Sequence, residues 1–164
     1  MPTLLLKISP TQTPARHQAL ADALTRLTAC HLGKREAVTA VLIDELPAMR
    51  WFVAGRGASR ATALLEISVT VGTNTPEQKA AFIEAAFAEL ELQLGAGGPL
   101  EPASYVIVRE LPATDLGYGG LTQKARQLAR ASAETAQAEA PVQRASPRVL
   151  SWAGLRSQGL VLPI

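Results

Sequence analysis

An internal repeat is the most constraining feature of this sequence of 164 residues. Residues 3–9 read TLLLKIS and return 59 positions later as TALLEIS. The Thr-Pro pair at residues 13–14 returns after 62 positions, and ELPA at residues 45–48 returns unchanged after 65. The spacing thus grows by three residues at two places, as insertions in connecting loops would make it grow. Such a pattern predicts two similar structural units that share one core.

Both copies predict the order strand, helix, strand. Each opens on a short apolar run, and the Thr-Pro pair then suits a helix start, with threonine as the N-cap and proline in the first turn. We expect strands over residues 3–9, 38–46, 62–71 and 105–111, and helices from Pro14 toward Gly33 and from Pro76 to about Leu94. A helix between two strands implies that the two strands are parallel.

The predicted fold class is therefore α/β (α+β), with two tandem β-α-β units forming a four-stranded sheet that has two helices on one face. A C-terminal helix over residues 121–138 and an extended arm from Pro141 complete the chain. We expect one domain overall, made of the first repeat (2–58), the second repeat (61–125) and the C-terminal helix and tail (126–164). Because runs such as Leu4-Leu5-Leu6 are apolar on both sides of a strand, the second face of the sheet needs a cover, which oligomerisation would supply most simply.

A segment rich in aromatic residues and glycine follows each ELPA and predicts a tight hairpin. The first reads MRWFVAG (residues 49–55) and the second contains LGYGGL (residues 116–121). A proline directly after the initiator methionine, opening a β-α-β unit that ends in such a hairpin, resembles the tautomerase superfamily. Two units in one chain resemble its fused 4-oxalocrotonate tautomerase members, over roughly residues 2–125. The resemblance implies a homotrimer in which six repeats surround a pseudo-hexameric core.

Pro2 is the candidate catalytic residue. Removal of Met1 before a small residue leaves a secondary amine at the end of the chain. An unperturbed α-amino group titrates near ~8, and burial among apolar side chains lowers its pKa because the ammonium form is disfavoured. A base whose pKa lies near the working pH suits proton abstraction next to a carbonyl. Ala61 takes the equivalent place in the second copy, inside the chain, so one active site per chain is expected.

The sequence departs from the family where arginines usually bind the substrate. Those positions hold Gln12 and Asn74 in the loops after the first strands, and Ala40 and Tyr105 in the second strands. The aromatic position of the first hairpin is kept as Trp51. The acidic partners of the family's dehalogenase and decarboxylase groups are also replaced, by Gly117 and Val38, which disfavours both of those reactions.

Other side chains offer themselves as substrate-binding groups. Arg50 and Arg109 are candidates for a bidentate clamp on a carboxylate. Gln12, Asn74 and Tyr105 are candidates for neutral hydrogen bonds to an enolate oxygen. Structural roles compete with these: Arg109 fits an ion pair with Asp44 or Glu110, and Trp51 fits an interface as well as a pocket wall.

Composition excludes several other function classes. The single cysteine, Cys30, rules out an internal disulfide and a cysteine-based zinc site, and two histidines argue against a histidine metal site. The net charge of +2 does not indicate a nucleic-acid surface, and it is unevenly placed, because residues 121–164 carry +4 and residues 1–120 carry −2. The sequence shows neither a signal-peptide pattern nor an apolar run approaching ~18 residues. We therefore expect a cytoplasmic protein, away from membranes and nucleic acid, that uses no cofactor and no metal.

Two functions follow as the main hypotheses. The favoured one is a cofactor-free enol–keto tautomerase that acts on a small 2-oxo acid or aryl-pyruvate enol, with Pro2 as general base. The alternative is a non-catalytic or weakly active tautomerase-fold trimer that binds a ligand or partner, since the usual arginines are replaced. A purely oligomeric scaffold is a third possibility. Retention of Met1 would favour the alternative, because Pro2 would then be an amide and not a base.

Overall fold

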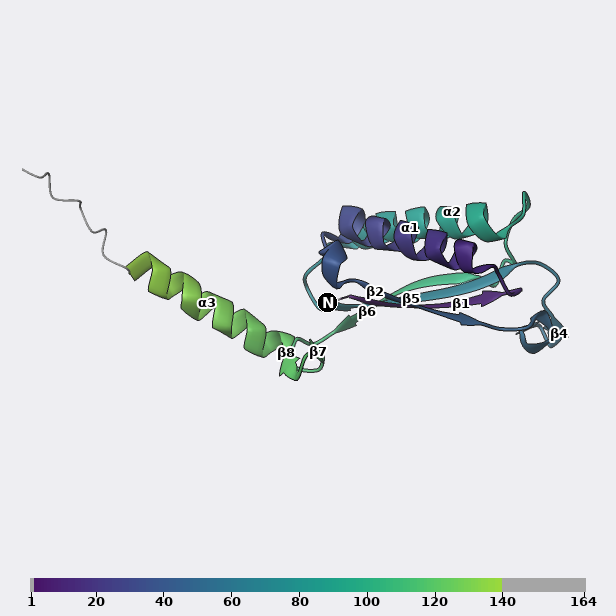
Figure 1. Cartoon of the computed structure of the whole chain (residues 1–164). Helices are drawn as coiled ribbons and strands as arrows, with labels where there is room; N and C mark the ends of the chain where they lie inside the picture. The colour runs from purple at the N-terminus through teal and green to yellow at the C-terminus, as the bar shows by residue number, and fades with distance from the viewer. Residues whose placement is uncertain (1, 140–164) are drawn as a thin grey trace, which may run out of the picture.

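Two β-α-β units lie side by side in the computed structural model, which describes residues 2–139 (Figure 1). The first unit consists of β1 (Thr3–Ser9), α1 (Pro14–Leu32) and β2 (Ala40–Glu45), and the second of β5 (Thr62–Thr70), α2 (Pro76–Leu94) and β6 (Tyr105–Leu111). Short 3₁₀ turns, η1 (Glu36–Val38) and η2 (Ala48–Arg50), flank β2. The predicted fold class is confirmed, and the extended arm expected from Pro141 lies outside the described residues.

The four long strands form one sheet in the order β2-β1-β5-β6. Strands are parallel within each unit, and β1 and β5 join the units as an antiparallel pair in which Thr3 lies opposite Ser68. The start of β1 therefore meets the end of β5. This topology brings Pro2 to the edge of the sheet at which β5 and β6 both end.

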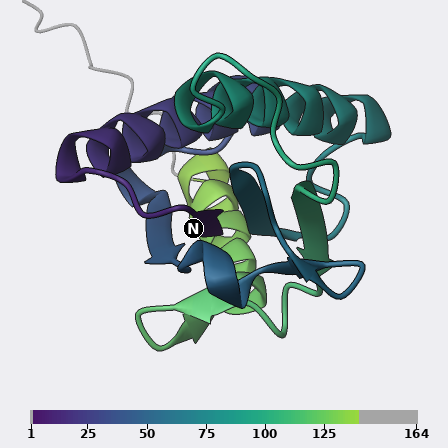
Figure 2. The ribbon, with the colours of Figure 1, turned by 90° about the vertical axis from the view of Figure 1, so that its right-hand side faces the viewer.

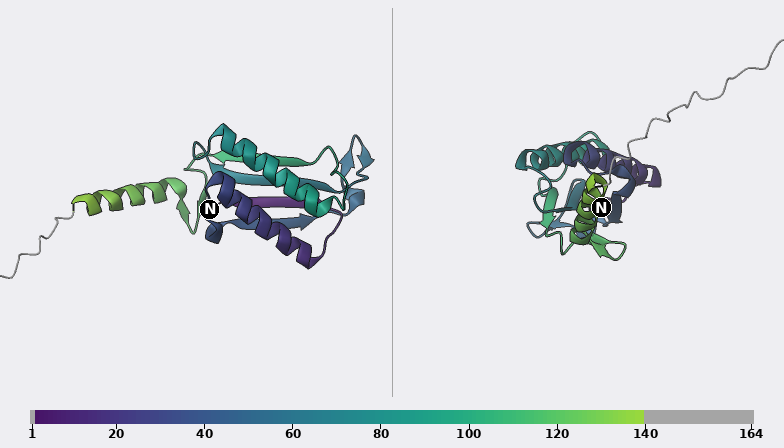
Figure 3. Two further views of the ribbon diagram at one scale, coloured as in Figure 1. Left: turned by 90° about the horizontal axis from the view of Figure 1, so that it is seen from above. Right: turned by 90° about the vertical axis from the view of Figure 1, so that its left-hand side faces the viewer.

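The core lies between the sheet and the two helices, which cover the same face (Figures 2 and 3). Alternate strand residues such as Leu4, Leu6 and Ile8 are fully buried on that face, because successive strand side chains point to opposite sides. Leu20 and Leu24 of α1 and Phe82 and Leu90 of α2 complete the packing. Both repeats thus contribute to a single apolar core.

The other face of the sheet is open and mixed in character. It exposes apolar side chains, with Leu5 at 44%, Leu42 at 52% and Tyr105 at 58% of their full area. The expectation of strands apolar on both sides holds only in part, because Lys7 and Arg109 share this face with those residues by strand alternation.

Two hairpins follow the units and lie at opposite ends of the sheet (Figure 1). The first pairs β3 (Phe52–Val53) with β4 (Arg56–Gly57), and the second pairs β7 (Gly117–Tyr118) with β8 (Leu121–Thr122). Each two-residue loop has positive φ at both positions, 50° and 74° at Ala54 and Gly55, and 56° and 74° at Gly119 and Gly120. That geometry is the one that favours tight hairpins.

The third helix, α3 (Gln123–Glu139), follows β8 directly and projects from the end of the sheet at which Pro2 lies. Three hydrogen bonds fix its base. The backbone amides of Gln123 and Lys124 donate to the carbonyls of Leu116 and Ala113, each at 2.8 Å, and that of Ala125 donates to Thr122 Oγ1 at 3.1 Å. Within residues 2–139, no helix has the length and apolar character needed to cross a membrane.

Helix α2 begins with a complete capping box. The Gln78 amide donates to Thr75 Oγ1 at 3.3 Å, and the Thr75 amide donates to Gln78 Oε1 at 3.0 Å. Thr75→Ala is expected to lower the free energy of unfolding by about 1 kcal/mol, because a helix amide loses its acceptor. Thr75→Ser, which keeps the oxygen, is the matched control. Urea denaturation measures both variants, and equal midpoints for the two would contradict the capping role.

Candidate functional site

Pro2 lies in a pocket at the end of the sheet. It is buried, its carbonyl accepts a hydrogen bond of 3.2 Å from the Ala40 amide, and it lines a cavity of about 190 Å³. The wall is built by the end of β5, the loop after it, the residue after the C-cap of α1, and the base of α3. The lining residues are Pro2, Lys34, Ser68, Val69, Thr70, Thr73, Leu116, Gln123, Arg126, Gln127 and Arg130.

The pocket is positively charged. Lys34, Arg126 and Arg130 line it, and none of its described lining residues is acidic. A small anion entering this space would meet positive side chains from two directions, α1 and α3. The arrangement therefore suits a substrate with a carboxylate, and it supplies cations that can stabilise an enolate oxygen.

Lys34 is placed by the end of α1. Gly33, with φ of 63°, ends the helix in the left-handed conformation that glycine tolerates best, and the chain then turns toward the loop after β5. There Lys34 Nζ donates to Thr73 Oγ1 at 3.0 Å. Burial lowers the pKa of the Lys34 ammonium from its usual value. A carboxylate bound beside it would favour the charged form again.

Asn74 directly follows the pocket residue Thr73, but its side chain forms hydrogen bonds with residues that do not line the pocket. Its Nδ2 donates to the Leu32 carbonyl at 2.9 Å and to Gln78 Oε1 at 3.2 Å, and the residue is buried. The Leu32 carbonyl is one of those left unpaired where a helix ends. Asn74 therefore joins the end of α1 to the start of α2, and its Nδ2 has an acceptor in each of these helices.

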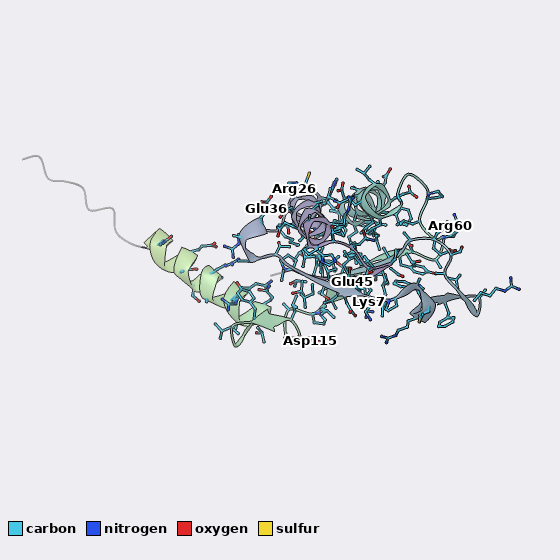
Figure 4. The ribbon with its side chains drawn as sticks, turned by 45° about the vertical axis from the view of Figure 1, so that its right-hand side comes forward. Lys7, Arg26, Glu36, Glu45, Arg60 and Asp115 are labelled. Atoms are coloured by element: carbon cyan, nitrogen blue, oxygen red, sulfur yellow. The ribbon has the colours of Figure 1, made fainter. Side chains whose placement is uncertain are left out.

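Three of the predicted substrate-binding residues come together, but away from Pro2. Arg50, Trp51 and Tyr105 line a second pocket of about 370 Å³, beside Lys7 and Phe52. This pocket lies at the opposite end of the sheet, since β2 and the hairpin after it run in the direction of β1. Figure 4 marks the two ends, with Asp115 beside the base of α3 and Arg60 at the far end.

Gln12 and Arg109 also lie apart from Pro2 and are engaged by other residues. Gln12 follows β1, whose seven residues separate it from Pro2 by roughly 23 Å. Its backbone amide donates to Glu45, as His17 Nε2 does at 2.8 Å, and these bonds hold the pKa of Glu45 below its usual value. Arg109 Nη2 lies 2.6 Å from Glu66 Oε1 on the neighbouring β5. The ion pair expected for Arg109 exists, but with Glu66 instead of Asp44 or Glu110.

The cations that line the Pro2 pocket are not among the substrate-binding residues predicted from the sequence; they are Lys34, Arg126 and Arg130. One signal was present, because Arg126 and Arg130 stand four residues apart in a predicted helix directly after the second hairpin. That spacing places both on one helix face. Their proximity to Pro2, however, depends on the antiparallel pairing of β1 with β5, which no local pattern predicts.

Comparison with known proteins identifies the family to which this two-unit fold belongs. Residues 6–60 match the family model described as tautomerase enzyme. The solved symmetric trimer of the Q0 fused 4-OT is 31% identical, with a TM-score of 0.67, and the match covers 76% of this chain and 98% of that one. The chain belongs to the tautomerase superfamily. Its two-unit architecture makes it a fused 4-OT-like member.

Two further solved structures resemble this tautomerase-family chain over the same share. The asymmetric trimer of the F6 fused 4-OT is 26% identical, with a TM-score of 0.68, covering 76% of this chain and 98% of that one. Pt0534, solved after inactivation by 2-oxo-3-pentynoate, is 21% identical with a TM-score of 0.67 and the same coverage, and at that identity supports the fold alone. Comparison with curated proteins gives no match.

Proposed function

We propose that this protein is a cofactor-free enol–keto tautomerase in which Pro2 transfers a proton on a small 2-oxo acid or aryl-pyruvate enol. The observation that carries the proposal is the burial of Pro2 in a pocket lined by Lys34, Arg126 and Arg130. A base and an anion-binding surface thereby share one small space. Membership of the tautomerase superfamily supports the same reaction class.

The proposed chemistry needs only this chain and its substrate. The neutral amine of Pro2 accepts the proton of the enol hydroxyl, the carbonyl forms, and the electron pair of the C=C bond shifts to the far carbon. The prolinium then gives a proton to that carbon, so base and substrate composition are both restored. The proline ring fixes the direction of the nitrogen, which reduces the entropy lost on reaching the reactive geometry. Positive side chains favour the enolate that develops between the two proton transfers.

We propose that the active form is a homotrimer. The Q0 and F6 fused 4-OT structures, to which this chain is similar, are trimers. Exposed Leu5 and Leu42 give the open face of the sheet an apolar centre that a neighbouring protomer would cover. Arg50, Trp51 and Tyr105 lie too far from Pro2 to serve it within one protomer. Any contact they make with substrate at Pro2 therefore requires a second protomer.

The alternative function is a non-catalytic trimer that binds a ligand or partner. It is favoured if Met1 is retained, because Pro2 then has no free amine. The presence of Gln12 and Asn74 at positions where the family usually has arginine also favours this alternative. The cations of the Pro2 pocket compensate for the missing arginines only if substrate binds among them.

Covalent labelling tests the proposed function directly. A conjugated ynone acid such as 2-oxo-3-pentynoate is attacked by a neutral amine at its alkyne carbon, so the product keeps every atom of the reagent. We expect intact-mass spectrometry of native protein to show loss of Met1. After treatment, we expect one added reagent, mapped by peptide digestion to the peptide that begins with Pro2. Retained Met1, or label on lysines alone, would contradict a Pro2 base.

A further inference from the structure

Helix α3 supplies most of the positive charge at the Pro2 pocket. Arg126 and Arg130 both line it and stand one helical turn apart, so they present the same face of α3 to the cavity. Gln123 and Gln127 fill the adjoining positions on that face. Four of the eleven lining residues thus come from the first two turns of this one helix.

Hydrogen bonds fix the position of the first turn of α3, from which these side chains extend. Backbone hydrogen bonds tie Gln123 and Lys124 to the segment before the second hairpin, each at 2.8 Å. Arg126 Nη2 donates to the Tyr118 carbonyl at 2.8 Å, and its guanidinium carbon lies 3.8 Å from the centre of the Tyr118 ring.

Arg126 keeps unused hydrogen-bonding capacity. Its Nε is shielded from solvent and has no hydrogen-bond partner among the described residues. A buried donor without an acceptor costs free energy. Arg130, which is exposed apart from its part in the pocket wall, forms no ion pair within residues 2–139. Two guanidinium groups beside Pro2 are therefore available to an anion.

The positions at which the family's repeat units usually carry arginine hold Gln12, Asn74, Ala40 and Tyr105 here. The cations that line the Pro2 pocket come instead from α3 and from Lys34.

We propose that α3 is an active-site element in which Arg126 and Arg130, together with Lys34, bind the carboxylate of the ligand that enters the Pro2 pocket. The guanidinium fork matches a carboxylate in shape and charge and can bind it through two parallel hydrogen bonds. The ligand class is a small organic carboxylate. The binding site does not depend on the proposed function, whereas its role in orienting an enol toward Pro2 rests on it.

The test compares two neutralised positions on the same helix. Arg130→Gln removes a pocket cation without disturbing the Arg126–Tyr118 contacts, and Lys124→Gln removes an exposed cation outside the pocket. The probes are trans-cinnamate, which has no enol to ketonise, and its neutral methyl ester. We expect Arg130→Gln to raise the Kd for cinnamate by about tenfold in an NMR titration. Lys124→Gln should leave it within about twofold, and neither variant should change binding of the ester.

The same experiment separates this inference from the proposed function. Cinnamate binds without being turned over, so its affinity reports the carboxylate contacts whether or not the protein is a tautomerase. Binding that depends on Arg130 in a protein without turnover would support the α3 site even though the tautomerase proposal had failed. Equal cinnamate affinities of Arg130→Gln and Lys124→Gln would overturn the α3 site. So would an unchanged KM for a carboxylate enol in an active Arg130→Gln enzyme.

Discussion

Pro2→Ala is expected to lower kcat/KM for ketonisation of phenylenolpyruvate and of 2-hydroxymuconate by about 100-fold or more. A positioned general base contributes that much, and alanine replaces a ring-fixed secondary amine by a freely rotating primary one. The measurement is the ultraviolet rate of ketonisation with purified protein, corrected for the rate in buffer. The arginines on α3 are unaltered in this variant, so the loss would report on the base alone.

Pro102→Ala is the matched control for that substitution. Pro102 is exposed, in the turn before β6, and does not line the Pro2 pocket. We expect its rate to equal that of the wild type.

The wild-type rate should also fall as the pH is lowered, because protonation removes the lone pair of the amine. Equal rates for Pro2→Ala and wild type would exclude Pro2 as the base, and rates equal to buffer for both would favour the binding alternative.

The repeat predicted the elements with little error because the signals that set them are local. Helices α1 and α2 begin 62 residues apart, as the two Thr-Pro pairs do, and both contain 19 residues. Strands β2 and β6 begin 65 residues apart, and so do the two hairpins. N-caps, apolar alternation and glycine turns each depend on residues only a few positions apart, so they can be recognised in a single sequence.

The errors in the element boundaries also have local causes. The strand expected over residues 38–46 begins at Ala40, because Glu36–Val38 forms a 3₁₀ turn first. The last helix begins at Gln123 instead of residue 121, because Leu121 and Thr122 pair with the other strand of the hairpin. Val38 would fit the strand but belongs to the 3₁₀ turn before it, and Leu121 would fit the helix but belongs to the hairpin before it.

The site was less predictable because it depends on how distant segments pair. Sequence alternation correctly places Tyr105 and Arg109 on one face of a strand, yet only the strand order shows that Glu66 is the acid beside Arg109. In the same way, the antiparallel pairing of β1 with β5 carries the second hairpin and α3 to Pro2, whereas the parallel pairing of β2 with β1 leaves Trp51 at the other end. The candidate residues of each copy could be identified from the sequence, whereas which of them lie close together could be known only from the order of the strands in the sheet.

Phe82→Ala is expected to lower the free energy of unfolding by about 3–5 kcal/mol, the cost of removing a large aromatic side chain from a packed core. Phe82 is fully buried on α2 within the cluster formed by both repeats. Leu92→Ala, on the same helix but at a residue that is 77% exposed, is the matched control and should change stability by less than about 0.5 kcal/mol. Urea denaturation at one fixed protein concentration is required, since oligomerisation makes stability depend on concentration.

The shared core gives this prediction a second, sharper readout. Phe82 belongs to the second repeat, whereas Trp51 belongs to the hairpin of the first. In a Trp152→Phe background Trp51 is the only tryptophan of the chain. If one core holds both repeats, Phe82→Ala should move the Trp51 fluorescence transition and the helical circular dichroism transition to the same lower urea concentration. A Trp51 transition that stays in place while the helical signal shifts would mean that the two repeats unfold independently, and the single core inferred from their packing would be wrong.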